Sequence, residues 1–372
     1  MRDPRLTKLA EVLVNYSVAV KPEQFVLVQG EDVAIEWIEA VAEAALKAGA
    51  HVETIVKLPE VEEHLLKNGT EAQRTHAKII QKYALEQADV WLTAFASRNT
   101  RRNSNVSSEL LKQMNQGASS WRKVYSARMG DKSLNWCGAQ FPTQADAQEA
   151  EMSLREYQEF VYQSGLLNTP DPAAAWREIE AQQECWVKYL DTKQELHFQA
   201  AGTDLKVGIM GRKWINCCGK VNFPDGEIFT SPIENQVHGY ITFSFPAIYM
   251  GKMVEGIRLE VVNGKIVKAT AEKGEELLLT LLEMDPGARY FGEVAIGTNY
   301  QIQKFTKNIL FDEKIGGTIH LAVGDAFGEA GGKNHSAIHW DMICDMRGAG
   351  TISADGEVFY RNGKFLDEVL GK

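Results

Sequence analysis

The sequence predicts two domains of different class: an α/β amino-terminal domain, in which helices flank a parallel sheet, and a β-rich α+β carboxy-terminal domain. Helical and short apolar segments alternate up to about residue 175, whereas short β runs separated by Gly, Pro and Asn fill the remainder. The length of 372 residues exceeds the size at which one hydrophobic core keeps growing. We therefore expect domains at residues 1–175 and 176–372, the second of them catalytic.

The first domain is expected to contain strands separated by helices. The elements follow in the order helix 5–16, strand 25–30, helix 33–50, strand 51–58, helical segments up to residue 85, and strand 90–96. Strands and helices at this spacing indicate βαβ units, and hence a parallel sheet. Neither a GxGxxG fingerprint nor a P-loop follows the first strand, so a nucleotide-binding role has little support.

Residues 171–194 open with Asp and Pro and carry apolar residues at helical spacing, which predicts a helix that joins the two halves. The dipeptides Asn263-Gly264 and Asp355-Gly356 lie between apolar runs and are strong hairpin signals. The expected β runs of the second half are 195–202, 205–210, 238–251, 256–271, 293–299, 318–324, 337–345 and 350–365.

Charge and composition exclude several classes of protein. The formal net charge is −10 and the acidic residues are dispersed rather than gathered in a tail. Nucleic-acid binding requires a basic face, so no nucleic-acid partner is expected. A hydrophobic content of 44% is ordinary for a folded globular protein.

The compartment is inferred from cysteines and from apolar segments. The cysteines are odd in number and contain no CxxC pair: Cys137, Cys185, Cys217, Cys218 and Cys344. They are expected to be reduced thiols. The first twenty residues lack the continuous apolar core of a secretory signal, and no stretch approaches the roughly 20 apolar residues that cross a bilayer. We expect a cytoplasmic protein with no membrane partner.

The segment KNHSAIHWDMICDMR, residues 333–347, places His339 and Asp341 two residues apart in a run typical of a buried strand. Side chains at i and i+2 of a strand point to the same face, so the imidazole and the carboxylate should project together. Such a pair is either two metal ligands presented by a sheet or a histidine paired with an acid for structural reasons.

Three further ionisable residues lie in segments expected to be buried or tightly turned, namely Glu227, Glu293 and His320. An unpaired carboxylate or imidazole is costly to desolvate there, and a divalent cation would compensate it. With His339 and Asp341 they form the mixed oxygen and nitrogen donor set typical of Zn, Co or Mn. Because five donors exceed the need of one tetrahedral zinc, they indicate two divalent metal ions with one bridging carboxylate.

Other catalytic arrangements have little support in the sequence. None of the eight histidines begins an HExxH motif, and no GxSxG elbow is present. The adjacent Cys217 and Cys218 adjoin no histidine, so packing explains them more simply than a role as nucleophile.

Four ordered motifs, NFPDGEIFTSP, FGEVAIGTN, LFDEKIGGTIHLAVGDAF and NHSAIHWD, resemble those of the aminopeptidase T and aminopeptidase S family of dinuclear metallopeptidases. The similarity continues upstream and covers essentially the whole chain. By this resemblance, the five donors fall on the metal-ligand positions of the family, and Glu313 falls on an acidic position close to the metals. The resemblance also implies a homodimer and peptide substrates with a free amino terminus.

The activity implied by the resemblance is that of a metal-dependent aminopeptidase, in which water activated by two metals attacks the peptide carbonyl. Glu313 is the first candidate to take the proton and return it to the leaving amine. Two alternatives stay open: a metal-dependent hydrolase of another amide, and a non-catalytic homologue that binds metal or peptide.

The chain departs from the family at one functional position. Where the family has a tyrosine shortly after the first histidine ligand, this chain has Phe327, which has no oxygen to bind metal or to donate a hydrogen bond. His335 lies four residues before His339 and could replace the hydroxyl, but a supporting or surface role is the favoured interpretation.

Overall fold

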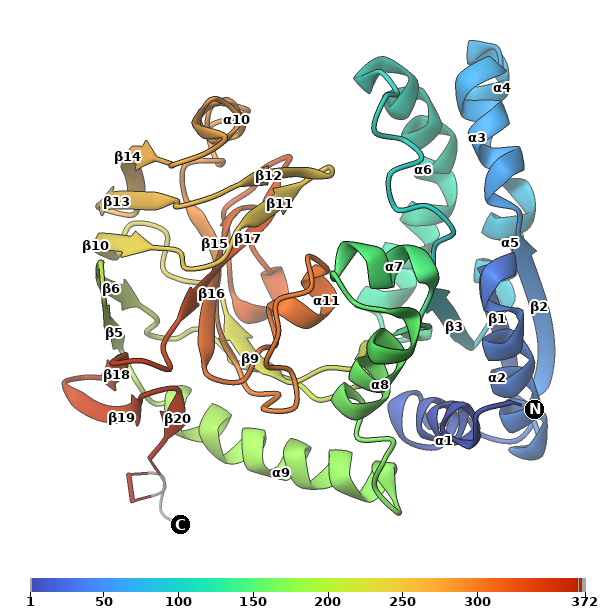
Figure 1. Ribbon diagram of the computed structural model, residues 1–372, viewed down its shortest axis with the longest axis horizontal. Helices are drawn as coiled ribbons and strands as arrows, with labels where there is room; N and C mark the ends of the chain where they lie inside the picture. Colours follow the sequence, from blue (N-terminus) through green and yellow to red (C-terminus); the bar gives the residue numbers. More distant parts are fainter. Residues whose placement is uncertain (1, 367, 370–372) are drawn as a thin grey trace. The chain divides into compact units, whose positions relative to one another are not determined.

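The computed structural model describes residues 2–366, 368 and 369 (Figure 1). By its internal contacts the chain divides into two compact units. The first comprises Met1–Ala175 and Gly219–Pro224, and the second comprises Trp176–Cys218 and Asp225–Lys372. The chain therefore returns briefly to the first unit after it has entered the second.

The first unit is built on a parallel five-stranded sheet in the order β2-β1-β3-β4-β8. This confirms the predicted α/β class. The strands are β1 (Phe25–Glu31), β2 (His51–Lys57), β3 (Val90–Phe95), β4 (Asn135–Gln140) and β8 (Asn222–Phe223). The central strands β1 and β3 are largely buried, as near-continuous apolar runs in a parallel sheet should be.

Side chains cap several helices of the first unit. Asp3 accepts a hydrogen bond from the backbone of Arg5, and Ser153 and Glu156 form a capping box. The helices are α1 (Pro4–Val12), α2 (Ile35–Lys47), α3 (Pro59–Asn68), α4 (Glu71–Arg74), α5 (Ile79–Gln87), α6 (Ser108–Gly130), α7 (Gln144–Glu149) and α8 (Leu154–Ser164). A π-helical turn, Leu13–Ser17, continues α1, and a 3₁₀ turn, Asp32–Ala34, precedes α2.

The second unit is a β sandwich, which confirms the β-rich class expected for it. An eight-stranded sheet has the order β14-β13-β10-β6-β5-β18-β19-β20, and a five-stranded antiparallel sheet has the order β17-β16-β15-β9-β7. The first sheet contains β5 (Glu195–Ala200), β6 (Thr203–Gly208), β10 (Val237–Thr242), β13 (Arg258–Val262), β14 (Lys265–Thr270), β18 (Thr351–Ala354), β19 (Glu357–Arg361) and β20 (Lys364–Phe365). The second contains β7 (Ile215–Cys217), β9 (Glu227–Thr230), β15 (Phe291–Gly297), β16 (Thr318–Gly324) and β17 (His339–Asp345).

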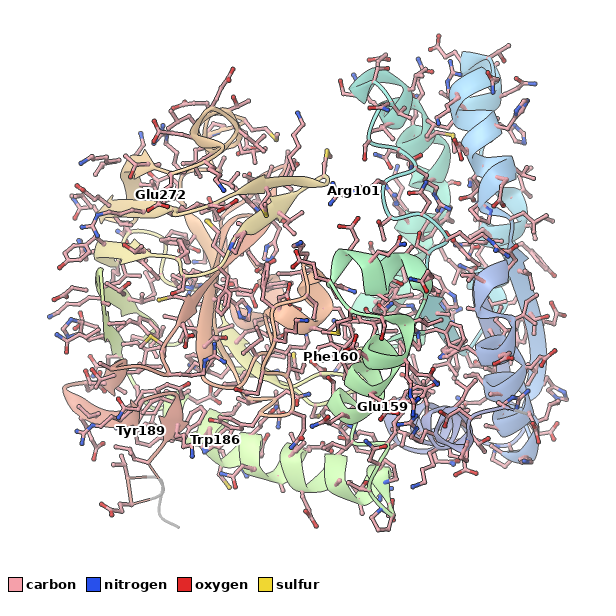
Figure 2. The ribbon with its side chains drawn as sticks, viewed as in Figure 1. Arg101, Glu159, Phe160, Trp186, Tyr189 and Glu272 are labelled. Carbon is pink, nitrogen blue, oxygen red and sulfur yellow. The ribbon has the colours of Figure 1, made fainter. Side chains whose placement is uncertain are left out.

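The remaining elements of this unit are short, apart from α9 (Pro172–Leu190), which leads the chain into it. They are the hairpin β11 (Ala247–Tyr249) and β12 (Lys252–Val254), the helices α10 (Glu275–Leu282) and α11 (Ile309–Asp312), and a 3₁₀ turn, Gly328–Ala330. Near the carboxyl end of α9, Trp186 and Tyr189 pack on the β19–β20 hairpin (Figure 2). Trp186 stacks on Phe365 with ring centroids 3.7 Å apart, and Tyr189 contacts Phe359.

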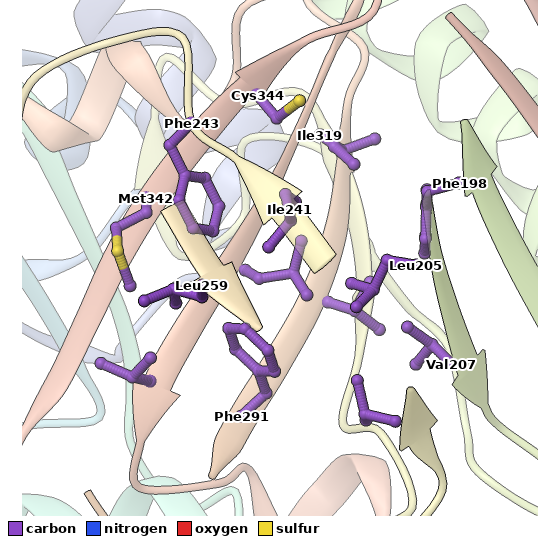
Figure 3. Packing of buried hydrophobic residues seen from close by; sticks show 14 of the residues in the cluster. Phe198, Leu205, Val207, Ile241, Phe243, Leu259, Phe291, Ile319, Met342 and Cys344 are labelled. Carbon is purple, nitrogen blue, oxygen red and sulfur yellow. The ribbon is translucent and has the colours of Figure 1, made fainter. Parts of the chain in front are cut away.

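The core of the second unit lies between its two sheets, where side chains from both interdigitate (Figure 3). Phe198, Leu205 and Leu259 come from the eight-stranded sheet, and Phe291 and Ile319 come from the five-stranded sheet. Every residue of β15 and β16 is buried, on the face away from this core as well as on the face toward it. Polar side chains on that other face therefore require partners.

None of the helices in the described part of the chain combines the length and the apolar character that spanning a lipid bilayer requires.

Two neighbouring valines on β13 test the sandwich. Val261 is 2% exposed and belongs to the core, whereas Val262 is 53% exposed. Val261→Ala should lower the free energy of unfolding by about 2 kcal/mol, because it removes two buried methyl groups and leaves a cavity. Val262→Ala should change it by less than about 0.5 kcal/mol. Urea unfolding measures both values, and equal losses would contradict the assigned faces.

Candidate metal centre

The five predicted ligands lie on one face of the five-stranded sheet. Directly opposite residues of an antiparallel pair share a face, and Glu293 on β15 lies opposite Ala322 on β16, which lies opposite Asp341 on β17. His320 and His339 each precede one of these positions by two residues, so they point the same way. The strand register thus brings together residues that are far apart in the sequence.

Glu227 joins this face from β9, the neighbour of β15 on its other side. It pairs with Gly297, which follows Glu293 by four residues and so lies on the same face. The structure therefore places all five predicted side chains on adjacent strands of one sheet.

Small residues lie across the strands from these side chains. His320 faces Ala295, His339 faces Gly324, and Ala322 lies between Glu293 and Asp341. Together with Gly297 opposite Glu227, they leave the space above the sheet to the polar groups. At Gly297 the need is steric, because a Cβ there would lie 2.3 Å from the backbone oxygen of Ile315. The segment after α11 can therefore approach the sheet closely.

The donor atoms form two groups that share Glu293. In one, Nε2 of His320 lies 3.2 Å from Oε2 of Glu227 and 3.7 Å from Oε1 of Glu293. In the other, Nε2 of His339 lies 3.1 Å from Oε2 of Glu293 and 3.6 Å from Oδ1 of Asp341. Within each group the ligand atoms lie within 4.8 Å of one another. Each oxygen of Glu293 thus faces a different histidine, as a bridging carboxylate requires.

The donor set fits divalent cations because several buried polar atoms have no hydrogen-bond partner among the described residues. They include Oε2 of Glu227, Oδ1 of Asp341 and both ring nitrogens of His320. His320 and Glu227 approach closely, yet their geometry is not that of a hydrogen bond. Buried polar atoms that point into a common space without bonding to each other are what a cation site presents.

The pKa values of the histidines reflect the excess of negative charge. Burial lowers the pKa of His339, but Asp341 and Glu293 raise it to about 11. Burial also lowers the pKa of His320, and Glu227 and Glu293 raise it well above its ordinary value. Bound cations would compete with these protons and supply the positive charge instead.

The donor side chains differ in their exposure to solvent. The side chains of Glu227, Glu293 and His320 are 8%, 6% and 1% exposed, whereas His339 is 30% exposed. Among these side chains, His339 is therefore the most accessible to solvent.

Glu313 lies at the carboxyl end of α11, close to this face of the sheet. Its carboxylate belongs to a third group of possible ligands with His320 and Asp341, again within 4.8 Å. Burial is the main cause that raises the pKa of Glu313 to about 8, and Glu227 and Asp341 add to it against the opposing effect of Lys314. The structure thus brings the predicted proton carrier beside the predicted ligands.

Sequence reasoning missed two charged neighbours of the cluster, Lys314 and Asp225. The side chain of Lys314 is fully buried and contacts Glu313, Oε1 of Glu227 at 3.4 Å and Oδ1 of Asp225 at 3.9 Å. The available signal was weak: a lysine followed by Ile and two Gly in DEKIGG, and an aspartate two residues before Glu227.

Gln183 on α9 was also missed, and it supports the strand that carries Glu227. Its side-chain amide donates hydrogen bonds to the backbone oxygens of Cys217 and Glu227, and its oxygen accepts one from Thr298. A buried amide that satisfies several groups fixes the position of the backbone it bonds.

Phe327 lies where the family resemblance leads us to expect a tyrosine. Its ring packs against Phe229 and contacts the His339 imidazole edge-on, with centroids 5.0 Å apart. His335 does not replace the missing hydroxyl, because its side chain is 91% exposed and lies 3.7 Å from Asp325. The surface interpretation of His335 is thus confirmed.

Comparison with known proteins gives one consistent result. The chain is 28% identical to aminopeptidase T of Thermus thermophilus, with 94% of each chain covered, and 27% identical to aminopeptidase 2 of Geobacillus stearothermophilus, with 99% of each covered. The solved structure of wild-type AmpT from Thermus thermophilus matches with a TM-score of 0.85 and 26% identity, over 98% of this chain and 99% of that one.

These relatives agree with the family resemblance expected from the four motifs. The model of the family described as thermophilic metalloprotease (M29) matches residues 2–365, which is nearly the entire chain. The chain therefore belongs to the M29 family of thermophilic metalloproteases.

Proposed function

We propose that this protein is a metal-dependent aminopeptidase that removes amino-terminal residues from peptides. Its family is one of metalloproteases, and the relatives it matches over most of its length are named aminopeptidases. The observation that supports the proposed site most strongly is the pair of donor groups that share Glu293.

Charge supports two divalent ions in this site. The cluster contains five carboxylates, those of Asp225, Glu227, Glu293, Glu313 and Asp341, and one buried ammonium, that of Lys314, which contacts three of them. With neutral histidines and all five carboxylates ionised, the cluster would have an excess of four negative charges, which two divalent cations would balance. One ion would leave half of this excess uncompensated in a buried site.

Each proposed ion has its own histidine. Glu227, His320 and one oxygen of Glu293 would hold the first, and the other oxygen of Glu293, with His339 and Asp341, would hold the second. Imidazole and carboxylate ligands suit Zn, Co or Mn, which are the metals we propose.

The reaction follows from this arrangement. When bound, a pair of such ions acidifies water and polarises the scissile carbonyl. Glu313 lies beside both donor groups, so its carboxylate can accept the proton of the attacking water and deliver it to the leaving amine. The free amino terminus of the substrate would bind a metal or an acidic residue of the site, which favours cleavage next to an unblocked amino terminus.

The working form that we propose is a homodimer in the cytoplasm. The dimer is expected from the family resemblance. The compartment is expected from an odd number of cysteines without a CxxC pair.

Metal removal should abolish the activity. After dialysis against a chelator, release of amino acids from unblocked peptides should fall to background, and Zn, Co or Mn should restore it. Peptides acetylated at the amino terminus serve as the control and should resist cleavage. Hydrolysis of other amides with the same metal dependence, but none of unblocked peptides, would favour the alternative hydrolase. Bound metal without turnover of any amide would favour a binding protein.

Glu293→Gln should remove both ions and the activity together, because Glu293 contributes one oxygen to each donor group. Elemental analysis after dialysis measures the metal content directly. Glu260→Gln is the matched control, since it alters only an exposed pair with Lys268 and should retain both. Two ions retained by Glu293→Gln would contradict the bridging role.

Glu313→Gln should lower the activity and leave the metal content unchanged. Loss of a general acid–base should lower kcat by about 10²–10⁴-fold. Elemental analysis should still find two ions, because neither donor group around Glu293 includes Glu313. A variant that loses metal in proportion to activity would make Glu313 a ligand instead of a proton carrier.

A further inference from the structure

Lys314 has a fully buried side chain, a rare environment for lysine unless the ammonium is paired. It lies in the segment after α11 that approaches the sheet at Gly297. Its ammonium contacts three carboxylates of the cluster, those of Asp225, Glu227 and Glu313.

The two oxygens of Glu227 face different partners. Oε1 lies 3.4 Å from the ammonium of Lys314, and Oε2 lies 3.2 Å from Nε2 of His320 without hydrogen bonding to it. The ammonium therefore engages one oxygen, and the other is left directed into the donor group. This is the orientation of a carboxylate prepared to bind a metal through a single oxygen.

The two histidines differ in how they are oriented. Nδ1 of His339 lies 2.8 Å from the backbone oxygen of Asp325, so a neutral carbonyl can accept its proton and leave Nε2 to the site. Nδ1 of His320 has no hydrogen-bond partner among the described residues. The backbone thus orients the imidazole of His339, whereas the other donor group contains Glu227, whose second oxygen lies against Lys314.

We propose that Lys314 is a positioning residue for one metal ion, the ion held by Glu227, Glu293 and His320. The inference rests on the proposed two-ion function and adds an asymmetry to it. Because Lys314 contacts Glu227, which belongs to the donor group of this ion and not to that of the other, its loss should weaken one metal position and spare the other.

Lys314→Met tests this asymmetry. Groups that orient metal ligands typically change metal affinity by about 10–100-fold when mutated, so one of the two ions should bind that much more weakly. The probe is Co²⁺ alone, titrated into metal-free protein while its visible absorption bands are recorded. Elemental analysis after dialysis should find two ions in the parent protein and one in the variant. Lys304→Met is the matched control, because Lys304 is exposed on the preceding loop.

The direction in which the metal affinity changes distinguishes a positioning role of Lys314 from simple charge compensation. Removing an ammonium also removes a repulsion, which alone would make the neighbouring ion bind more tightly. Tighter binding, or equal weakening at both positions, would overturn the proposal. Lys314→Arg keeps the charge and should retain two ions. If Lys314→Met does not fold, Lys314→Gln replaces it, since its amide can donate to Glu227 without charge and should still weaken one ion.

Failure of this proposal is distinguishable from failure of the proposed function. A parent protein that binds fewer than two Co²⁺ ions would contradict the two-ion centre itself. A parent protein that binds two, together with a variant that binds both with unchanged affinity, would contradict only the role of Lys314.

Discussion

The concentration of buried negative charge on one face of a sheet is the constraint that organises the second unit. Five carboxylates converge where β15 and β16 are buried on both faces, so each of them has lost most of its hydration. Isolated charges in such a place are costly, and one lysine compensates only part of them. The strongly raised pKa values of both histidines are the response of the cluster to that imbalance.

The fold meets this constraint through strand register more than through loops. An antiparallel sheet places side chains from β15, β16 and β17 in rows, and the buried sandwich core holds these strands rigidly from behind. Ligand positions on strands are more precisely fixed than positions on loops, which suits a site whose two donor groups must share one carboxylate. Asp225, Glu313 and Lys314 come from connecting segments, and Gly297 allows the segment that carries Glu313 and Lys314 to lie close to the sheet.

Much of the fold was predictable because its local signals agree with its architecture. The Asn263-Gly264 and Asp355-Gly356 turns do connect β13 to β14 and β18 to β19, and α9 begins at Pro172 as its capping pattern indicates. The helix α6 was not predicted, because its sequence is largely polar and Gly117 interrupts its centre. A Cβ at Gly117 would lie 2.5 Å from the backbone oxygen of Arg74, so close packing explains the glycine. The return of residues 219–224 to the first sheet depends on tertiary contacts that no local pattern records.

The candidate ligands were predictable because charged residues in apolar strands need partners, and the family resemblance supplied the set. Lys314 was not predictable in the same way. A single lysine beside an acidic residue usually indicates a solvated loop, and only the three-dimensional approach of the α11 segment reveals its burial. The position of Phe327 against His339 was likewise beyond the sequence, although the departure from the expected tyrosine was visible there.

The alanines and glycines across from the candidate ligands help to decide which homologues of uncertain activity have room for metal ions. A homologue could keep all five donor residues and still lack room for ions if a bulky side chain replaced Ala322 or Ala295, because both lie in the rows occupied by the donors. Small side chains at these positions are therefore as necessary to the centre as the donors themselves. A sequence comparison that checks these small residues as well as the five donors would separate active enzymes from inactive homologues with the same fold.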